Sequence, residues 1–207
     1  MVSAYGGWLN TAQILEAYKA RNPITPRQVR LARRVWNAFS EPTPRALSLL
    51  LADDLNDLPE IRDTITFLLQ EYPESSGGLS RLERKLLRTV DSLGFTTPAA
   101  TVGTVLRTDI VGDSFLFDML RSFVMAPHPL LCFAEPFKGA FKSYLFNGSK
   151  IAMTDTGRSV LVGKVDHIAL NGIERWIGGV HLTGNRVRWR WDESSNGIVP
   201  QRELERR

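Results

Sequence analysis

The sequence has little cysteine and no long apolar run. Cys132 is the only cysteine among 207 residues, so the chain cannot close an internal disulfide and has no cysteine-based zinc spacing. No stretch approaches the roughly 20 apolar residues that a membrane-spanning helix needs. The start, MVSAYGGWLN, lacks the basic and apolar regions of a secretory signal. We therefore expect a cytoplasmic bacterial protein with no metal, no cofactor and no membrane partner.

A strong excess of charge of one sign is also missing. The 26 lysine and arginine residues exceed the 22 acidic residues by only four, and the pI is about 9.5. Arginine dominates the basic residues, and its planar guanidinium favours paired contacts to phosphate or carboxylate groups. The composition is therefore compatible with an acidic partner, nucleic acid included, without demanding one.

Signals for helix starts organise the first hundred residues. Thr-Pro pairs at 25–26, 43–44 and 97–98 each combine a capping threonine with a proline that needs no hydrogen-bond donor in the first turn. Ser80 and Glu83 match the capping-box pattern. Between these signals, the small polar segment ESSGGLS (74–80) predicts a boundary. We expect a helical segment over 5–73 and a second module from residue 79.

The second module has the element order of a winged helix. Helices are expected at 80–92, 97–106 and 112–126, and short strands at LLCFA (130–134), SYLFN (143–147) and KIAMT (150–154). A closing hairpin is expected to pair VHL (180–182) with VRWRW (187–191). The prediction is a mainly α, α+β fold with a winged-helix-like module over 79–192 and a loosely held polar tail over 193–207.

The third helix of that module does not suit DNA reading. A recognition helix needs basic or amide side chains to meet base edges and phosphates. Here the helix carries Asp113 and Asp118 against Arg121 and is otherwise mostly apolar. Its phenylalanines instead indicate a surface that docks a protein, and the residues expected to do so are Phe115, Phe117 and Phe123.

Arginines recur at helical and strand spacing, and three sets are candidates for binding nucleic acid or an acidic protein. The helix from Pro26 is expected to bury Val29, Ala32, Val35, Trp36 and Phe39, with basic residues on its opposite face. A set of basic residues opposite an apolar face is also the ordinary pattern of a solvated helix. The candidates are Arg27, Arg30, Arg33 and Arg34; Arg81, Arg84, Lys85 and Arg88; and Arg186, Arg188 and Arg190.

The stretch VDHIALNGIERWIGGVHL (165–182) has two interpretations. Its polar side chains supply a base, an orienting carboxylate and an amide, the ingredients of a hydrolytic or metal site. No nucleophile motif accompanies them. The alternative is a structural clasp in which Trp176 is buried and hydrogen-bonded, and that reading predicts low exposure of both Trp176 and His181. The residues concerned are Asp166, His167, Asn171 and His181.

Four stretches are distinctive as a set: YGGWLNTAQILEAYKARNPITPRQVRLARRVWNAFSEPTPRAL, EYPESSGGLSRLERKLL, MTDTGRSVLVGKVDHIALNGIERWIGGVHL and WRWD. Together they resemble the C-terminal portion of a bacterial family known as domain of unknown function 1835, from about Tyr5 to Asp192. The family brings no activity with it. Members of that family look as though they carry an α/β domain upstream of this region. The resemblance therefore implies that this chain is a short member or a fragment.

These observations lead to one expectation and two alternatives. We expect a non-catalytic binding or assembly module with an arginine-rich surface for an acidic partner. A hydrolase centred on Asp166 and His181 is the enzymatic alternative. A scaffold that docks a protein through the 112–126 helix is the third.

Overall fold

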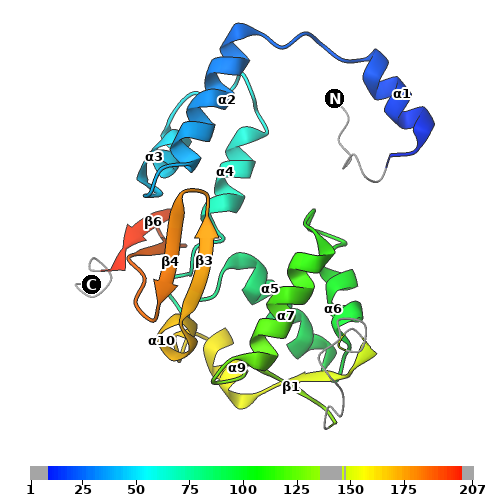
Figure 1. Cartoon of the computed structure of the whole chain (residues 1–207), viewed down its shortest axis with the longest axis vertical. Helices are drawn as coiled ribbons and strands as arrows, with labels where there is room; N and C mark the ends of the chain where they lie inside the picture. The colour runs from blue at the N-terminus through cyan, green and yellow to red at the C-terminus, as the bar shows by residue number, and fades with distance from the viewer. Residues whose placement is uncertain (1–8, 136–145, 147, 202–207) are drawn as a thin grey trace.

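The chain combines short helices with two-stranded antiparallel sheets, so the expected α+β class is confirmed. The computed structural model describes residues 9–135, 146 and 148–201. Figure 1 shows two groups of elements, with helix α1 (Thr11–Lys19) standing apart from both. Each group has its own hydrophobic core.

The first core is formed by the middle of the chain. Its elements are α5 (Arg81–Leu93), α6 (Pro98–Val105), α7 (Asp113–Met125), β1 (Leu131–Phe133), β2 (Ile151–Met153) and α9 (Asp155–Leu161). Strand β1 pairs antiparallel with β2, and Thr96 adds a bridge to Ile151. Leu86, Leu120 and Phe123 are fully buried among these elements. The three expected helices and the strands within 130–134 and 150–154 are confirmed.

Local capping explains why these helices begin where they do. The Ser80 hydroxyl accepts a hydrogen bond from the Glu83 amide, and the Glu83 carboxylate accepts one from the Ser80 amide, as the capping-box pattern predicted. The expected caps at Thr25 and Thr97 are confirmed. The side chain of each threonine accepts a hydrogen bond from the amide three residues later, at the starts of α2 and α6. The expected cap at Thr43 is wrong, because α3 begins only at Arg45, after Pro44.

The expected strand SYLFN (143–147) lies outside the described residues except for Phe146. That residue has helical backbone and is buried in the first core. Strand β2 pairs antiparallel with β1, the strand within 130–134.

The second core joins the two ends of the chain. Helices from the N-terminal half are α2 (Pro26–Phe39), α3 (Arg45–Leu49), the 3-10 helix η2 (Leu50–Ala52) and α4 (Ile61–Leu69). They pack against α10 (His167–Asn171) and the strands β3 (Ile173–Ile177), β4 (Val180–Gly184), β5 (Trp189–Asp192) and β6 (Gly197–Pro200). The expected 79–192 module is thus divided, since Trp189 and Trp191 lie in one core with Leu31 and Tyr72.

The strand pairing expected near the C-terminus is wrong. Strand β4 pairs with β3, and β5 pairs with β6. The turn between β3 and β4 is at Gly178, where a φ of 57° and a contact with the Phe39 carbonyl leave no room for a side chain. The expected loose tail is also wrong for 197–200, because β6 buries Val199 beside β5.

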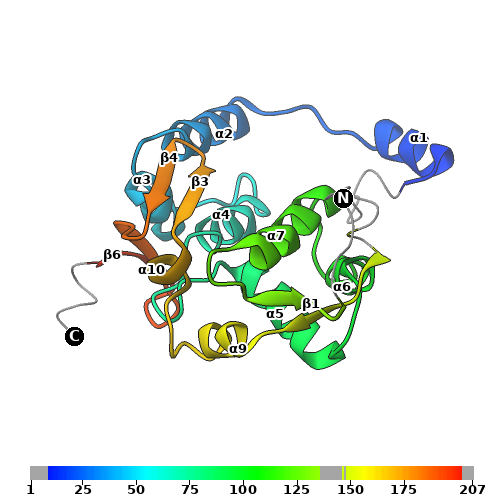
Figure 2. The same ribbon diagram turned by 60° about the horizontal axis from the view of Figure 1, so that its bottom comes forward.

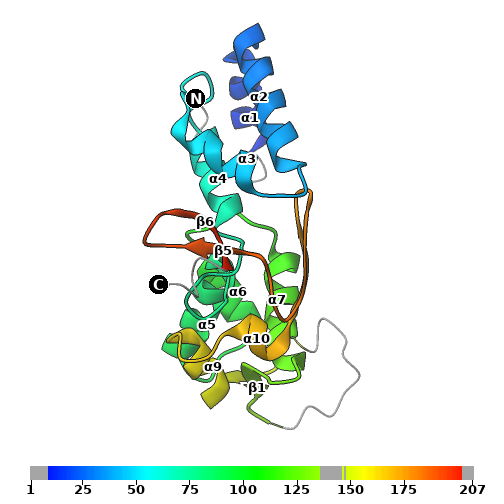
Figure 3. The same cartoon turned by 90° about the vertical axis from the view of Figure 1, so that its left-hand side faces the viewer.

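The segment 74–80, which connects α4 to α5, is held to the second core by backbone hydrogen bonds. The Ser75 amide donates to the Trp191 carbonyl at 2.8 Å, and the His167 amide donates to the Gly77 carbonyl at 2.8 Å. Gly78 has a φ of 72°, and a side chain there would lie 2.8 Å from the Asp166 carboxylate. Figure 3 shows β5 and β6 between the helices α2, α3 and α4 on one side and the helices α5, α6 and α7 on the other.

Helix α2 buries a different face from the one expected. Leu31, Val35 and Ala38 enter the second core, whereas Val29 and Trp36 are exposed. Two overlapping apolar stripes are present on this helix, and α3 and α4 cover only one of them.

Candidate functional site

An apolar groove of about 640 Å³ opens between the two cores. One side comes from the end of α2 and from α4, and the other comes from the loop 108–111 and the start of α7. Strand β3 and its turn close the groove. The principal apolar side chains that line it are Phe39, Phe67, Leu68, Ile110, Phe115 and Trp176.

Four large side chains of the groove are open to solvent. The exposed fractions are 65% for Trp176, 59% for Ile110, 54% for Phe67 and 47% for Phe115. Single exposed apolar residues are ordinary, but contiguous ones lining a concavity are typical of binding surfaces. The groove therefore has the shape and chemistry of a site for an apolar ligand segment.

Glu71 lies on the floor of this groove. Its Oε2 accepts a hydrogen bond from the Ser80 hydroxyl at 3.1 Å, and its buried Oε1 has no partner among the described residues. Burial, and then the neighbouring Glu83 carboxylate, raise the pKa of Glu71 to about 7. Near neutral pH this carboxyl is therefore protonated in part of the molecules.

An ion pair beside Glu71 connects the two cores. Arg175 of β3 pairs with the buried Glu83 of α5 and reaches the Glu71 carbonyl at 3.4 Å. Burial alone would raise the pKa of Glu83, but the Arg175 guanidinium holds it below its ordinary value. The floor therefore carries charges that are already compensated.

The polar residues of 165–182 do not share one site. Asp166 caps α10 and binds Arg190 with two hydrogen bonds, of 2.8 and 3.2 Å. Asn171 exchanges two hydrogen bonds with the backbone of His128, and its amide nitrogen lies 3.3 Å from Nδ1 of the buried His167. These three residues are brought together at α10, at the base of the β3–β4 hairpin.

His181 lies toward the other end of that hairpin. It pairs with Glu174 and stacks on Trp176 with ring centroids 4.4 Å apart. Both His181 and Trp176 are exposed, so the low exposure that the clasp interpretation predicts is wrong for both residues. Trp189 and Trp191 are the tryptophans that hold the second core together.

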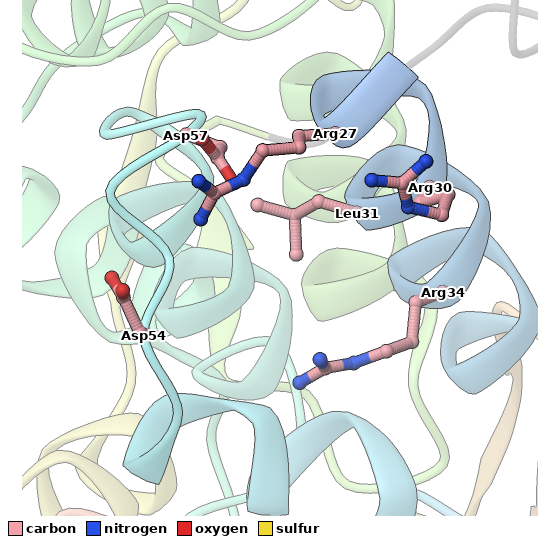
Figure 4. A pocket seen from close by; sticks show the side chains of 6 residues that line it. All are labelled: Arg27, Arg30, Leu31, Arg34, Asp54 and Asp57. Atoms are coloured by element: carbon pink, nitrogen blue, oxygen red, sulfur yellow. The ribbon is translucent and has the colours of Figure 1, made fainter.

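Three arginines of the first set, Arg27, Arg30 and Arg34, line a pocket of about 430 Å³ on α2 (Figure 4). Arg27 pairs with Asp57 at 3.2 Å, and Arg34 pairs with Asp53. Arg30 and Arg33 are exposed and have no partner in the described parts of the chain. The pocket combines free and compensated arginines, with Leu31 at its base and Asp54 on its far side.

The second and third sets are largely occupied within the fold. Arg81 pairs with Asp109, which also binds Lys85, and Arg84 pairs with Glu74 and donates to two carbonyls. Arg88 remains exposed. In the third set Arg186 and Arg188 are exposed, but Arg190 is only 2% exposed because it holds Asp166.

The three phenylalanines of the 112–126 helix have different environments. Phe123 is fully buried and Phe117 packs against the first core, so neither forms a docking surface. Phe115 alone faces the groove. The sequence analysis missed three residues of the groove, Phe67, Ile110 and Glu71. Of these, only Phe67 gave a signal in the sequence, because it is an apolar residue on the otherwise polar face of an amphipathic helix.

No protein-family model matches the chain, and neither the search of curated proteins nor the search of solved structures found a similar one. No described helix has the length and apolar character needed to cross a membrane. Within residues 9–135, 146 and 148–201, no cluster of three or more histidine, cysteine or acidic residues could hold a metal ion.

Proposed function

We propose that this chain is a non-catalytic protein-binding module whose groove accepts an apolar segment of a partner protein. One observation carries the proposal: four large apolar side chains, contributed by both cores, are exposed along a single groove. Covering apolar area removes it from water at about 25 cal/mol per Å², which is the main driving force for such association.

The polar floor supports this role. A partner that covers buried charges stabilises the complex only if those charges are compensated. Arg175 is compensated by Glu83, and Arg81 by Asp109. Glu71 can become neutral by taking up a proton, since its pKa is about 7. The groove can therefore be covered without leaving an isolated charge.

In this proposal the first core is a winged-helix-like unit that forms one wall of the groove. It has the order of three helices followed by an antiparallel strand pair, and α7 stands where a recognition helix would be. The exposed surface of α7 carries Asp113, Asp118 and Arg121, which disfavours contact with phosphates. We therefore assign protein docking, rather than DNA reading, to this unit.

An acidic partner is the second candidate, and the pocket on α2 supports it. Arg30 lines this pocket, and Arg33 lies on the same helix; both are exposed and uncompensated among the described residues. Arg186 and Arg188, near the C-terminal strands, add exposed positive charge. Labelled duplex and single-stranded DNA, followed by fluorescence anisotropy from low to physiological salt, tests the nucleic-acid form. A steep loss of affinity with salt supports it, and no binding at low salt rejects it.

We also propose that the chain belongs to the family that it resembles, domain of unknown function 1835. That family supplies no activity, so the proposed role rests on the geometry of the groove.

A peptide selection tests the groove. Peptides of about twelve residues displayed on phage are selected on the full chain, immobilised at low density, and the enriched sequences are measured against the variants Ile110→Glu and Leu49→Glu. Both variants place a new charge at an exposed apolar position, but only Ile110 lines the groove. We expect amphipathic peptides that lose at least tenfold in affinity for Ile110→Glu alone. Enriched peptides that bind both variants equally, or no enrichment, would overturn the proposal.

A further inference from the structure

Helix α1 exposes an apolar face that the described chain leaves uncovered. Ile14, Leu15 and Tyr18 lie on one side of this nine-residue helix, and each is more than half exposed. None of the residues of α1 is buried. An isolated helix of this length is not stable in water, even with a capping box such as that of Asn10, so α1 requires a surface to pack against.

A complementary strip runs along α2 into the groove. Val29 and Trp36 are 45% and 66% exposed, and they share a face with Phe39, which lines the groove. The rings of Trp36 and Phe39 are 6.1 Å apart. The strip and the groove therefore form one continuous apolar surface, long enough to receive a short helix.

Two prolines direct α1 away from this surface in its own chain. Pro23 and Pro26 disfavour helical backbone at Asn22 and Thr25, and Thr25 is extended, with φ −82° and ψ 154°. Figures 1 and 2 show the connection leaving the start of α2 and carrying α1 clear of both cores. A stiff, extended connection opposes a tight turn back onto α2 and favours packing against another molecule.

We propose that two copies of the chain exchange α1, each laying the face of Ile14, Leu15 and Tyr18 on the α2 strip and groove of the other. This inference rests on the proposed function, because it names the occupant of the same groove. Exchange of one element between two copies gives a closed pair with two identical junctions. The opposite face of α1, with Gln13 and Glu16, stays in solvent.

Sedimentation equilibrium of the full chain from about 1 to 200 μM tests the exchange. The variants Ile14→Glu and Tyr18→Glu place a charge in the junction, and Gln13→Glu places the same charge on the opposite face of α1 as a control. We expect a concentration-dependent dimer for the natural chain and for Gln13→Glu, and at least tenfold weaker association for the other two. A natural chain that stays monomeric, or junction variants that dimerise like the control, would overturn the proposal.

Mixing two variants distinguishes exchange from other modes of self-association. Ile14→Glu damages α1 and Ile110→Glu damages the groove, so a mixed pair retains one intact junction whereas each variant alone retains none. We expect the mixture to associate more tightly than either variant alone, and a mixture no tighter than its components would contradict exchange. If exchange fails while selected peptides still require Ile110, the groove binds protein segments and only the occupant is wrong.

Discussion

Replacing Glu71 by glutamine is expected to change how the stability of the fold depends on pH. The pKa of Glu71 is about 7 in the folded chain and 4.5 ordinarily, because burial disfavours the charged carboxylate. A group whose folded pKa is raised contributes stability that is complete below its unfolded pKa and is lost as the pH rises through its folded pKa. The natural chain should therefore lose stability between about pH 4.5 and pH 7, and Glu71→Gln should not lose this contribution.

The size of the effect follows from the two pKa values. The difference between about 7 and 4.5 corresponds to on the order of 3 kcal/mol in the free energy of unfolding, most of it developed between pH 5 and pH 8. Glutamine keeps the shape of the protonated carboxyl and can still accept the hydrogen bond from Ser80. Any cost of the amide itself is the same at every pH and cancels in the comparison.

Urea unfolding at pH 5, 6, 7 and 8, followed by circular dichroism, measures the effect. Glu60→Gln is the matched control, because Glu60 is exposed at the start of α4 and the change removes the same charge. Relative to the natural chain, Glu71→Gln should gain about 2 to 3 kcal/mol between pH 5 and pH 8, and the control should gain none. Equal pH dependence in all three proteins would refute the assignment of a buried, partly protonated carboxyl to the floor of the groove.

Three substitutions test the two cores and their connection, each by urea or thermal unfolding. Asp166→Ala leaves Arg190 buried without a counter-charge and should cost about 3 to 5 kcal/mol. Gly78→Ala should lower the melting temperature by several degrees, because its φ is 72° and its side chain would contact Asp166. Phe123→Ala should cost about 3 to 5 kcal/mol through a cavity in the first core.

For each of these three substitutions, a specific result would contradict the expectation. Asp155→Ala removes an exposed carboxylate from α9 and serves as the control for Asp166→Ala. If the two aspartate variants lose the same stability, the Arg190 ion pair does not stabilise the packing of α10 against β5. Gly78→Ala with an unchanged melting temperature would show that the 74–80 segment can relax. A loss below 1 kcal/mol for Phe123→Ala would place that ring outside a tightly packed interior.

Local signals in the sequence predicted three helix starts and the strands of the first core. Helix starts at Thr25, Ser80 and Thr97 depend on hydrogen bonds within three residues of the cap, so the sequence alone determines them. The strands β1 and β2 were also expected, because each is a short apolar run flanked by polar or proline residues.

The second core and the groove depend on contacts between distant residues, which local patterns do not contain. Arg190 alternates with tryptophans and was expected to be exposed, yet Asp166, 24 residues earlier, compensates it in the interior. Helix α2 offers two apolar stripes, and only the position of α3 and α4 decides which is buried. The groove was not predicted because its walls come from segments that lie far apart in the sequence.

The occupant of the groove can be identified by photo-crosslinking within an isotope-mixed sample. Phe115 is replaced by p-benzoylphenylalanine in the full chain, and equal amounts of natural-abundance and nitrogen-15 protein are equilibrated, irradiated and digested for mass spectrometry. The account predicts crosslinks from position 115 to residues 11–19. These crosslinks should join one natural-abundance chain to one nitrogen-15 chain. Crosslinks confined to single chains, or none to residues 11–19, would contradict the exchange of α1 into the groove.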